Sequence, residues 1–362
     1  MKQHPTLQSR RHFLNALGGA GLTAPALWSA LPAQARAAPP FEVRPAPRYF
    51  PRDGFTPEVD LAGKVAVITG ASRGIGLAVG RALQALGVQV IGTSRTPLSY
   101  PSHPFPLLPL DLADPASLQG FPALVASRPE VLGAGGIDIL INNAGRGVVG
   151  GVVPIDPATY FAGIQTTLAT LYGGHVAVTS ALLRAVAARS SSGYARILFT
   201  TSVQAYLEGG EDVGITYAHG YTSAKRALLA YANGLRTVLA GAAPGIRVST
   251  LNPLWTSTDI ALGTRPILLQ PVDGDGNAVG DPGFQLVLDA FRALVANGLP
   301  TSYAAQAYVQ LLTTTDPEAN VVVGSDVEPF ASQSGAATFT ALISDEMKQS
   351  AVPWVAGPRA RP

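Results

Sequence analysis

One segment near residue 65 constrains the fold more than any other. The apolar run at 65–68 leads into three glycines, Gly70, Gly74 and Gly76, and then into a stretch with helical spacing at 77–86. A short continuous apolar run is typical of a strand buried on both faces of a parallel sheet. Glycines allow the tight turn by which such a strand enters a helix. The segment therefore predicts the first strand-turn-helix unit of a parallel α/β fold.

The same alternation recurs along the rest of the chain. Helical stretches at 175–188 and 221–240 separate further apolar runs of strand length. These runs lie at 88–91, 107–110, 137–141, 197–199 and 246–251. Strands that alternate with helices at this spacing form a parallel sheet with helices on both faces. We therefore predict an α/β fold with a Rossmann-type doubly wound parallel sheet, in a single domain with a C-terminal substrate lid.

The first 37 residues have the pattern of an export signal. The pair Arg10-Arg11 precedes a weakly apolar stretch at 16–31, and a small-x-small site ends at Ala37. This order is typical of a twin-arginine signal peptide. Glycines and a proline interrupt the apolar stretch, so we expect no stable membrane span. The sequence therefore predicts recognition by the twin-arginine translocation machinery and a periplasmic location.

Beyond residue 37 the chain divides into an arm, a catalytic domain and an extension. Residues 38–60 hold six prolines and little periodicity, which predicts an extended arm on the domain surface. Residues 61–330 contain the strand and helix pattern, and a stretch at 259–300 rich in Gly, Pro and apolar residues is typical of a lid. Residues 331–362 form a C-terminal extension.

The composition excludes several kinds of site. The chain of 362 residues has no cysteine, which excludes thiol catalysis, disulfides and thiolate metal ligands. Its five histidines lack paired ligand spacing, so we expect no metal. The net charge is +2, and removal of residues 1–37, with four of the 25 basic residues and none of the 23 acidic ones, leaves −2. We therefore expect no nucleic-acid partner.

The glycine turn has the chemistry of a dinucleotide site. A pyrophosphate binds backbone N–H groups and the positive end of a helix dipole, and glycines leave both accessible. A glycine cluster alone would fit any tight turn, but its place between a buried strand and a helix favours cofactor binding. The predicted cofactor contacts are Gly70, Ser72, Arg73, Gly74, Ile75 and Gly76.

The end of the next strand discriminates between NAD and NADP. An NAD enzyme presents Asp or Glu there to the adenine ribose, but this chain has Gly92-Thr93-Ser94-Arg95. No carboxylate repels a 2′-phosphate, and the guanidinium groups of Arg95 and Arg73 have the geometry to pair with one. The sequence therefore favours NADP over NAD. The alternative is that both arginines are solvated surface residues.

Two further motifs join the glycine turn. Asn142-Asn143-Ala144-Gly145 follows an apolar strand, and Tyr221-Thr222-Ser223-Ala224-Lys225 begins a helical stretch. Together with residues 69–76, these motifs resemble the short-chain dehydrogenase/reductase family in type and order. The resemblance implies that the cofactor is also lined by Asp111, Leu112, Asn143, Gly145, Tyr221, Lys225 and Thr258.

Tyr221 and Lys225 have the spacing of an acid/base pair. They lie one helical turn apart, so they project from the same face of a helix. An ammonium group near a phenol favours the phenolate, so we expect Lys225 to lower the pKa of Tyr221 from about 10 toward neutrality. The resemblance implies a third catalytic residue, a hydroxyl at the end of the preceding strand. Ser202 matches it best, and Thr201 is second.

The chain departs from the family pattern around its catalytic residues. Ser202 and Tyr221 are 19 residues apart, more than the family usually shows, which predicts an inserted loop at 208–219 on the rim of the active site. The usual Pro-Gly that follows the last strand of the core becomes Pro253-Leu254. Both departures affect the geometry of the site and leave the predicted fold unchanged.

A family asparagine that helps to organise a proton-relay water is missing. No Asn lies between Gly145 and Tyr221. Counting forward from the Asn-Asn-Ala-Gly motif puts Thr167 at its position, and counting back from the following helix puts Leu171 there. Either Gln165 or Thr167 substitutes for the asparagine, or the relay is altered.

These features predict an NADP(H)-dependent oxidoreductase that interconverts a ketone or aldehyde and an alcohol. Tyr221 would exchange the proton, Lys225 would adjust the pKa of Tyr221, and Ser202 would polarise the carbonyl. The apolar lid favours a hydrophobic substrate, and the resemblance implies a homodimer or homotetramer. Two alternatives stay open: a non-catalytic NADP-binding protein, and an isomerase or lyase with retained cofactor. Because the twin-arginine route exports folded proteins, we expect the cofactor to be held tightly.

Overall fold

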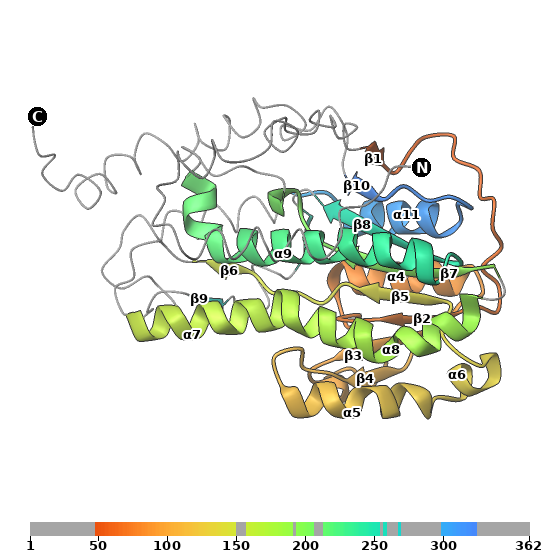
Figure 1. The fold of residues 1–362 in the computed structure, drawn as a ribbon, viewed down its shortest axis with the longest axis horizontal. Coiled ribbons are helices and arrows are strands. Elements are labelled where there is room, and N and C mark those ends of the chain that lie inside the picture. The colour runs from red at the N-terminus through yellow and green to blue at the C-terminus, as the bar shows by residue number, and fades with distance from the viewer. Residues whose placement is uncertain are drawn as a thin grey trace, which may run out of the picture. The chain divides into compact units, whose positions relative to one another are not determined.

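Within the computed structural model, the described residues are 48–149, 157–190, 193–205, 213–253, 256–258, 267–268 and 298–323. In this part of the chain, eight parallel strands form one sheet in the order β1-β10-β8-β7-β5-β2-β3-β4 (Figure 1). The strands are β1 (Arg48–Phe50), β2 (Val65–Ile68), β3 (Gln89–Ser94), β4 (Leu107–Pro109), β5 (Ile139–Asn142), β7 (Ala195–Thr200), β8 (Ile246–Pro253) and β10 (Asn320–Val323). A separate pair joins β6 (Val148–Val149) to β9 (Ile267–Leu268).

The strand order confirms the predicted doubly wound topology. From β2 the chain passes outward through β3 and β4, and then returns to β5 on the other side of β2. It continues outward through β7, β8 and β10. Sheets with this topology bind ligands beyond the carboxyl ends of the strands, at the point where the order reverses. That point lies between β2 and β5, and we call it the crevice.

Helices cover both faces of the sheet, and each face has its own core (Figure 1). Ile68 belongs to the core on one side and Val67 to the core on the other, because successive residues of a strand point to opposite faces. This explains why the first strand is apolar throughout. The first face carries α4 (Gly74–Ala85) and α11 (Thr301–Leu312), and the second carries α5 (Pro115–Ala126), α8 (Gly174–Ser190) and α9 (Val213–Ala242). The other described helices are α6 (Pro129–Ala134), α7 (Pro157–Leu168), the 3-10 turns η1 (Pro97–Ser99) and η3 (Val203–Ala205), and the π-helical turn η2 (Ala169–Gly173).

The edge strand β1 comes from the proline-rich arm. It pairs with β10, with Arg48 opposite Val321 and Phe50 opposite Val323. The sequence predicts only an extended arm here, since three residues between Pro47 and Pro51 give no strand pattern. The pairing covers backbone N–H and C=O groups that β10 would otherwise present at the edge of the sheet.

The helices α7 and α8 run on through η2 as one segment from Pro157 to Ser190. By length and composition this segment could cross a membrane. However, α8 packs on β5 and β7, and its residues Val178, Leu182 and Val186 are buried in the core of the second face. We therefore interpret the segment as a core helix of the α/β fold.

The predicted loop at 208–219 is wrong from Val213 onward, where α9 begins. Gly214 and the β-branched residues beside it weaken the local helix preference, so the sequence gives no signal that the helix of Tyr221 starts this early. Residues 208–212 lie outside the described residues, as do 1–37, 331–362, Leu254 and the predicted lid apart from 267–268 and 298–300.

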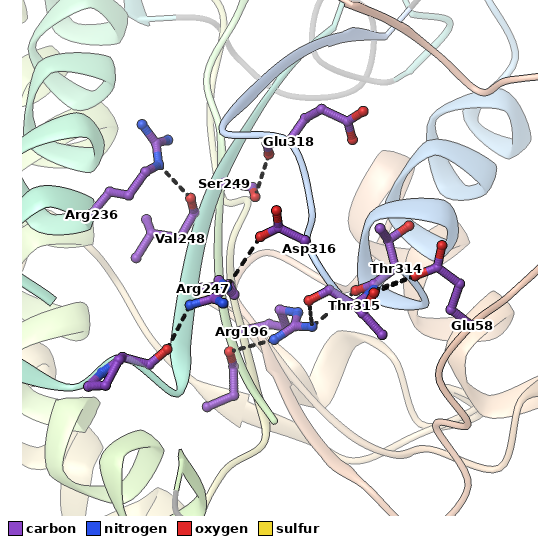
Figure 2. A network of polar contacts seen from close by, with 12 residues as sticks. Glu58, Arg196, Arg236, Arg247, Val248, Ser249, Thr314, Thr315, Asp316 and Glu318 are labelled. Atoms are coloured by element: carbon purple, nitrogen blue, oxygen red, sulfur yellow. Dashed lines mark hydrogen bonds and ion pairs between the residues drawn. The ribbon is translucent and has the colours of Figure 1, made fainter. Parts of the chain in front are cut away.

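A network of polar contacts lies at the amino ends of the central strands, on the side of the sheet away from the crevice (Figure 2). Arg196, at the start of β7, is buried and donates from Nη2 to the carbonyl oxygens of Thr314 at 3.0 Å and Thr315 at 3.3 Å. Its guanidinium also lies 4.2 Å from the centre of the Tyr194 ring. Glu58 accepts hydrogen bonds from the N–H and the hydroxyl of Thr315, at 2.8 and 2.6 Å. The network therefore ties the connection between α11 and β10 to the arm and to β7.

We expect Arg196→Met to lower the free energy of unfolding by about 3 kcal/mol, because it leaves two backbone carbonyls without their donor. Urea denaturation at pH 7 measures the change. Arg247→Met is the matched control from the same network, since Arg247 pairs at 3.6 Å with the largely exposed Asp316 and should cost less than about 1 kcal/mol. An equal loss of unfolding free energy in the two variants would contradict the conclusion that Arg196 holds the connection between α11 and β10.

Candidate active site

The predicted cofactor residues gather at one edge of the sheet. Each of them, apart from the α9 pair Tyr221 and Lys225, follows the carboxyl end of a strand, and Ser202 does the same at the end of β7. Residues 70–76 follow β2, Arg95 follows β3, Asp111 and Leu112 follow β4, Asn143 and Gly145 follow β5, and Thr258 follows β8. The structure thus brings together, at the predicted crevice, residues that are up to 188 positions apart in the sequence.

The glycine turn packs directly on the Asn-Asn-Ala-Gly motif. Gly70 has a φ of +64°, and a Cβ atom on it would lie 2.6 Å from the Cα atom of Ala144. A Cβ atom on Gly76, in the first turn of α4, would lie 2.4 Å from the carbonyl oxygen of Gly70. Gly74 faces Thr258, whose Cγ2 would be 3.4 Å from an added Cβ. The turn therefore has room only for glycine at its closest contacts, and it leaves the N-terminus of α4 open to an anion.

Asn143 and Thr69 hold the ends of three strands together. The hydroxyl of Thr69 accepts the backbone N–H groups of Asn143 at 2.9 Å and Ala144 at 3.0 Å. The side-chain amide of Asn143 donates to the carbonyl oxygens of Thr69 and Gly70, at 3.1 and 3.2 Å, and its Oδ1 accepts from the hydroxyl of Thr200 at 3.2 Å. Asn143 thus links β2, β5 and β7 beneath the predicted cofactor.

Two arginines and a carboxylate meet at the outer end of the crevice. Arg95 is exposed after β3, and Arg146, which sequence reasoning missed, is half-buried after β5. Burial lowers the pKa of Arg146, the charge of Arg95 acts in the same direction, and Asp111 opposes them. The signal in the sequence was the position of Arg146 directly after Asn-Asn-Ala-Gly. Arg73 occupies the position before α4, within the glycine turn.

The predicted catalytic residues converge from the end of β7 and from α9. Ser202 and Tyr221 are close enough for the Ser202 side chain to act on the Tyr221 phenol and to favour its deprotonation. Thr201, the second match in the sequence, directs its hydroxyl to Asn252 instead. Lys225 is buried, donates from Nζ to the carbonyl oxygen of Thr200 at 2.8 Å, and lies 5.6 Å from the centre of the Tyr221 ring. The structure therefore places Ser202, Tyr221 and Lys225 in one site.

The expected lowering of the Tyr221 pKa is wrong for the protein without ligands. Burial raises the pKa of Tyr221 to about 12, and the side chain of Ser202 opposes this shift. Burial also lowers the pKa of Lys225 to about 8. The physical reason is that desolvation acts on both groups, while the ammonium group donates to the Thr200 carbonyl rather than to the phenol. At neutral pH Tyr221 is therefore protonated, the form that donates a proton.

Leu171, one of the two positions that counting gives for the missing asparagine, lies in the wall beside Tyr221. It is fully buried in the π-helical turn η2, and together with Ala224 it contacts Tyr221. The hydroxyl of Thr167 bonds back to the carbonyl oxygen of Gly163 at 2.7 Å, and Gln165 is exposed. Neither of these side chains replaces the asparagine, so the structure favours an altered relay.

A further polar pair that the sequence did not reveal borders the same apolar cluster. Tyr160, on α7, packs with Ile164 against Leu171. The hydroxyl of Tyr160 is hydrogen-bonded to Nε2 of His219, and the two rings stack with their centres 5.8 Å apart. His219 precedes Tyr221 by two residues on α9. The wall beside Tyr221 is therefore mainly apolar, with one hydroxyl–imidazole pair.

The doubly wound sheet, the glycine cradle and the Ser-Tyr-Lys site define a Rossmann-type α/β oxidoreductase. The family model described as short chain dehydrogenase matches residues 64–266. The chain therefore belongs to the short-chain dehydrogenase/reductase family, which uses nicotinamide cofactors.

Known relatives agree with this assignment. A dehydrogenase/reductase SDR family protein 7-like from Anopheles gambiae is 32% identical over 216 residues, which are 56% of this chain and 62% of that protein. A short-chain dehydrogenase/reductase from Burkholderia phymatum in complex with NAD has a TM-score of 0.57 at 18% identity, over 84% of this chain and 99% of that one. The Pseudomonas aeruginosa RhlG/NADP active-site complex has a TM-score of 0.55 at 21% identity, over 74% of this chain and 96% of that one. The two structures share the fold.

Proposed function

We propose that the protein is an NADP(H)-dependent oxidoreductase that interconverts a hydrophobic ketone or aldehyde and the corresponding alcohol. The observation that carries this proposal is the convergence of Tyr221 and the buried side chains of Ser202 and Lys225, in which Ser202 acts on the Tyr221 phenol and Lys225 lies one helical turn further on. A hydroxyl donor, an acid and a buried cation at one sheet edge are the groups that carbonyl reduction requires. The mainly apolar wall of Leu171, Ile164 and Ala224 supports a hydrophobic substrate.

The residues at the crevice fit a nicotinamide dinucleotide. The turn at Gly70 and Gly76 is a cradle that a single Cβ atom would fill, and it lies at the N-terminus of α4. When bound, the cofactor supplies or accepts a hydride. The chain then contributes the proton: Tyr221 donates it from its phenol to the carbonyl oxygen, Ser202 polarises that oxygen, and Lys225 keeps a positive charge beside the phenol.

The test begins with the processed protein from a periplasmic fraction. We expect mass spectrometry of the released nucleotide to identify NADP(H), and a panel of apolar ketones and alcohols to show hydride exchange that depends on Tyr221. Bound nucleotide without turnover would favour the non-catalytic binding protein, and conversion of the substrate without net redox change would favour the isomerase or lyase.

The preference for NADP is expected to depend on Arg95. Arg95→Ala removes a guanidinium group available to a 2′-phosphate, so we expect the Kd for NADP to rise about 30-fold, in line with a charged hydrogen bond worth about 2 kcal/mol. The Kd for NAD should change less than about threefold, since NAD has no 2′-phosphate. Calorimetric titration with both nucleotides checks this. Equal weakening for both would instead show that Arg95 supports the adenine or the fold.

Export through the twin-arginine route is part of the same proposal. We expect Arg10→Lys combined with Arg11→Lys to leave full-length protein in the cytoplasm, because the paired arginines are what the translocation machinery recognises. Fractionation followed by immunoblotting of the precursor and mature forms measures the change. A mature form in the periplasm at the wild-type level would contradict the signal assignment.

We also propose tight retention of the cofactor after export and self-association as a homodimer or homotetramer. Retention predicts that nucleotide stays bound through extensive dialysis of the mature protein. Light scattering of the eluted protein gives the number of subunits, and a monomer at micromolar concentration would remove the oligomer from the proposal.

A further inference from the structure

Two buried polar atoms beneath the active site lack hydrogen-bond partners among the described residues. They are Nδ1 of His175 and Oδ1 of Asn142, and both side chains are fully buried. The other ring nitrogen of His175, Nε2, lies 2.9 Å from the carbonyl oxygen of Ala144. Because a carbonyl only accepts, Nε2 carries the hydrogen and Nδ1 is an acceptor. Buried polar atoms are rarely left unpaired, so these two acceptors call for a donor.

The two acceptors belong to side chains at the place where α8 packs on β5. His175 and Thr179 lie one helical turn apart on α8, and the amide nitrogen of Asn142 donates to the hydroxyl of Thr179 at 2.9 Å. Asn142 and Ala144, the two partners at the end of β5, are two residues apart. One face of α8 therefore contacts one side of β5, and the unpaired atoms lie along this contact.

Lys225, on α9, reaches the strand beside Asn142, because its partner Thr200 directly follows Phe199, which lies opposite Asn142 in the sheet. Its positive charge acts on His175 and, together with the larger effect of burial, lowers the pKa of the imidazole to about 3, so His175 is neutral at working pH. Lys225 makes one hydrogen bond among the described residues, to the carbonyl oxygen of Thr200. An ammonium group has three N–H donors. A buried ammonium with a single partner leaves further donors for other acceptors.

We propose that one buried water molecule binds between Nζ of Lys225, Nδ1 of His175 and Oδ1 of Asn142, and that His175 is a positioning residue for Lys225. The water accepts from Lys225 and donates one hydrogen to each of the two acceptors, which satisfies all three groups. By accepting from Nζ it stabilises the ammonium over the amine, and so keeps a positive charge beside Tyr221. The catalytic consequence rests on the proposed function, whereas the water site does not.

Two substitutions of His175 separate this role from simple support of the fold. His175→Gln places an amide nitrogen near the position of Nε2 and keeps the donor to Ala144, but has no acceptor near Nδ1. His175→Asn places an oxygen near Nδ1 and loses the donor to Ala144. We expect His175→Gln to shift the alkaline limb of the pH profile for kcat to a pH about one unit lower. Above that limb, kcat should then be about tenfold lower than in the wild type. His175→Asn, the conservative variant, should restore the limb to within about 0.3 unit. The opposite order would show that only the bond to Ala144 matters and would overturn the proposal.

Two measurements do not depend on turnover. A high-resolution crystal structure should show an ordered water within about 3 Å of all three atoms, and a direct hydrogen bond between Asn142 and His175 in its place would overturn the proposal. NMR titration of the Lys225 side chain, whose signal is identified by its loss in Lys225→Met, should give a lower pKa for Lys225 in His175→Gln than in His175→Asn. If the water and this difference are present but no carbonyl is reduced, the water site stands and the proposed function fails.

Discussion

Replacing Tyr221 by phenylalanine is expected to lower kcat for carbonyl reduction by about 10³-fold, the middle of the range for loss of a general acid. The variant removes the hydroxyl on which Ser202 acts and keeps the ring that packs beside Leu171 and Ala224. Because the phenol is protonated at neutral pH in the free protein, the loss should be seen directly as a missing proton donor. The thermal midpoint and nucleotide binding should stay close to those of the wild type.

Tyr231→Phe is the matched control for this experiment. Tyr231 lies on the same helix, α9, ten residues beyond Tyr221, and its ring meets that of Phe199 edge-on with the centres 5.8 Å apart. The same loss of a hydroxyl at this position should change kcat less than about twofold. Stopped-flow measurement of cofactor oxidation at pH 7 compares the two variants. If Tyr221→Phe retains a tenth of the wild-type kcat, another group supplies the proton.

The strands and the glycine turn could be predicted because local physical chemistry decides them. The run at 65–68 coincides with β2, since a strand buried on both faces is apolar at every position. Gly70 and Gly76 were identified for their lack of a side chain, and the contacts that a Cβ atom would make at each position show why. The order of Tyr221 and Lys225 along one helix was likewise a local property.

The features that the sequence did not reveal depend on contacts between distant segments. The pKa of Tyr221 was expected to fall because Lys225 is close in sequence, but it rises because residues far from both in the sequence bury the phenol. His175 and Arg146 acquire their roles from neighbours on other elements, Ala144 for the one and Arg95 for the other. Short or weak local patterns also give no prediction. At β1 the strand forms because its three residues pair with the edge of β10, which the local sequence does not reveal.

Replacing Lys225 by methionine tests the electrostatic part of the site. We expect kcat/KM for reduction at pH 7 to fall about 100-fold, because methionine fills a similar volume but carries no charge to stabilise the developing phenolate. In the wild type, with the pKa of Lys225 at about 8, reduction should decline as the pH rises above 8 and the ammonium loses its proton. The variant should lack this limb. A pH profile with the same alkaline limb in both proteins would assign it to another group.

The same substitution should also change how the free energy of unfolding depends on pH, because Lys225 binds its proton less tightly in the folded protein than in the unfolded chain. The pKa of Lys225 is lower in the folded protein, at about 8, than its ordinary value of 10.5. Between these values the unfolded chain binds more protons, so the free energy of unfolding of the wild type rises with pH. We expect the difference between Lys225→Met and wild type to change by about 2 kcal/mol from pH 8 to 9.5, in favour of the wild type. Urea denaturation within this window avoids the opposite effect of Tyr221, whose raised pKa acts only above pH 10. A difference that stays constant with pH would mean that Lys225 keeps its ordinary pKa in the fold, and the explanation of the alkaline limb would then fail with it.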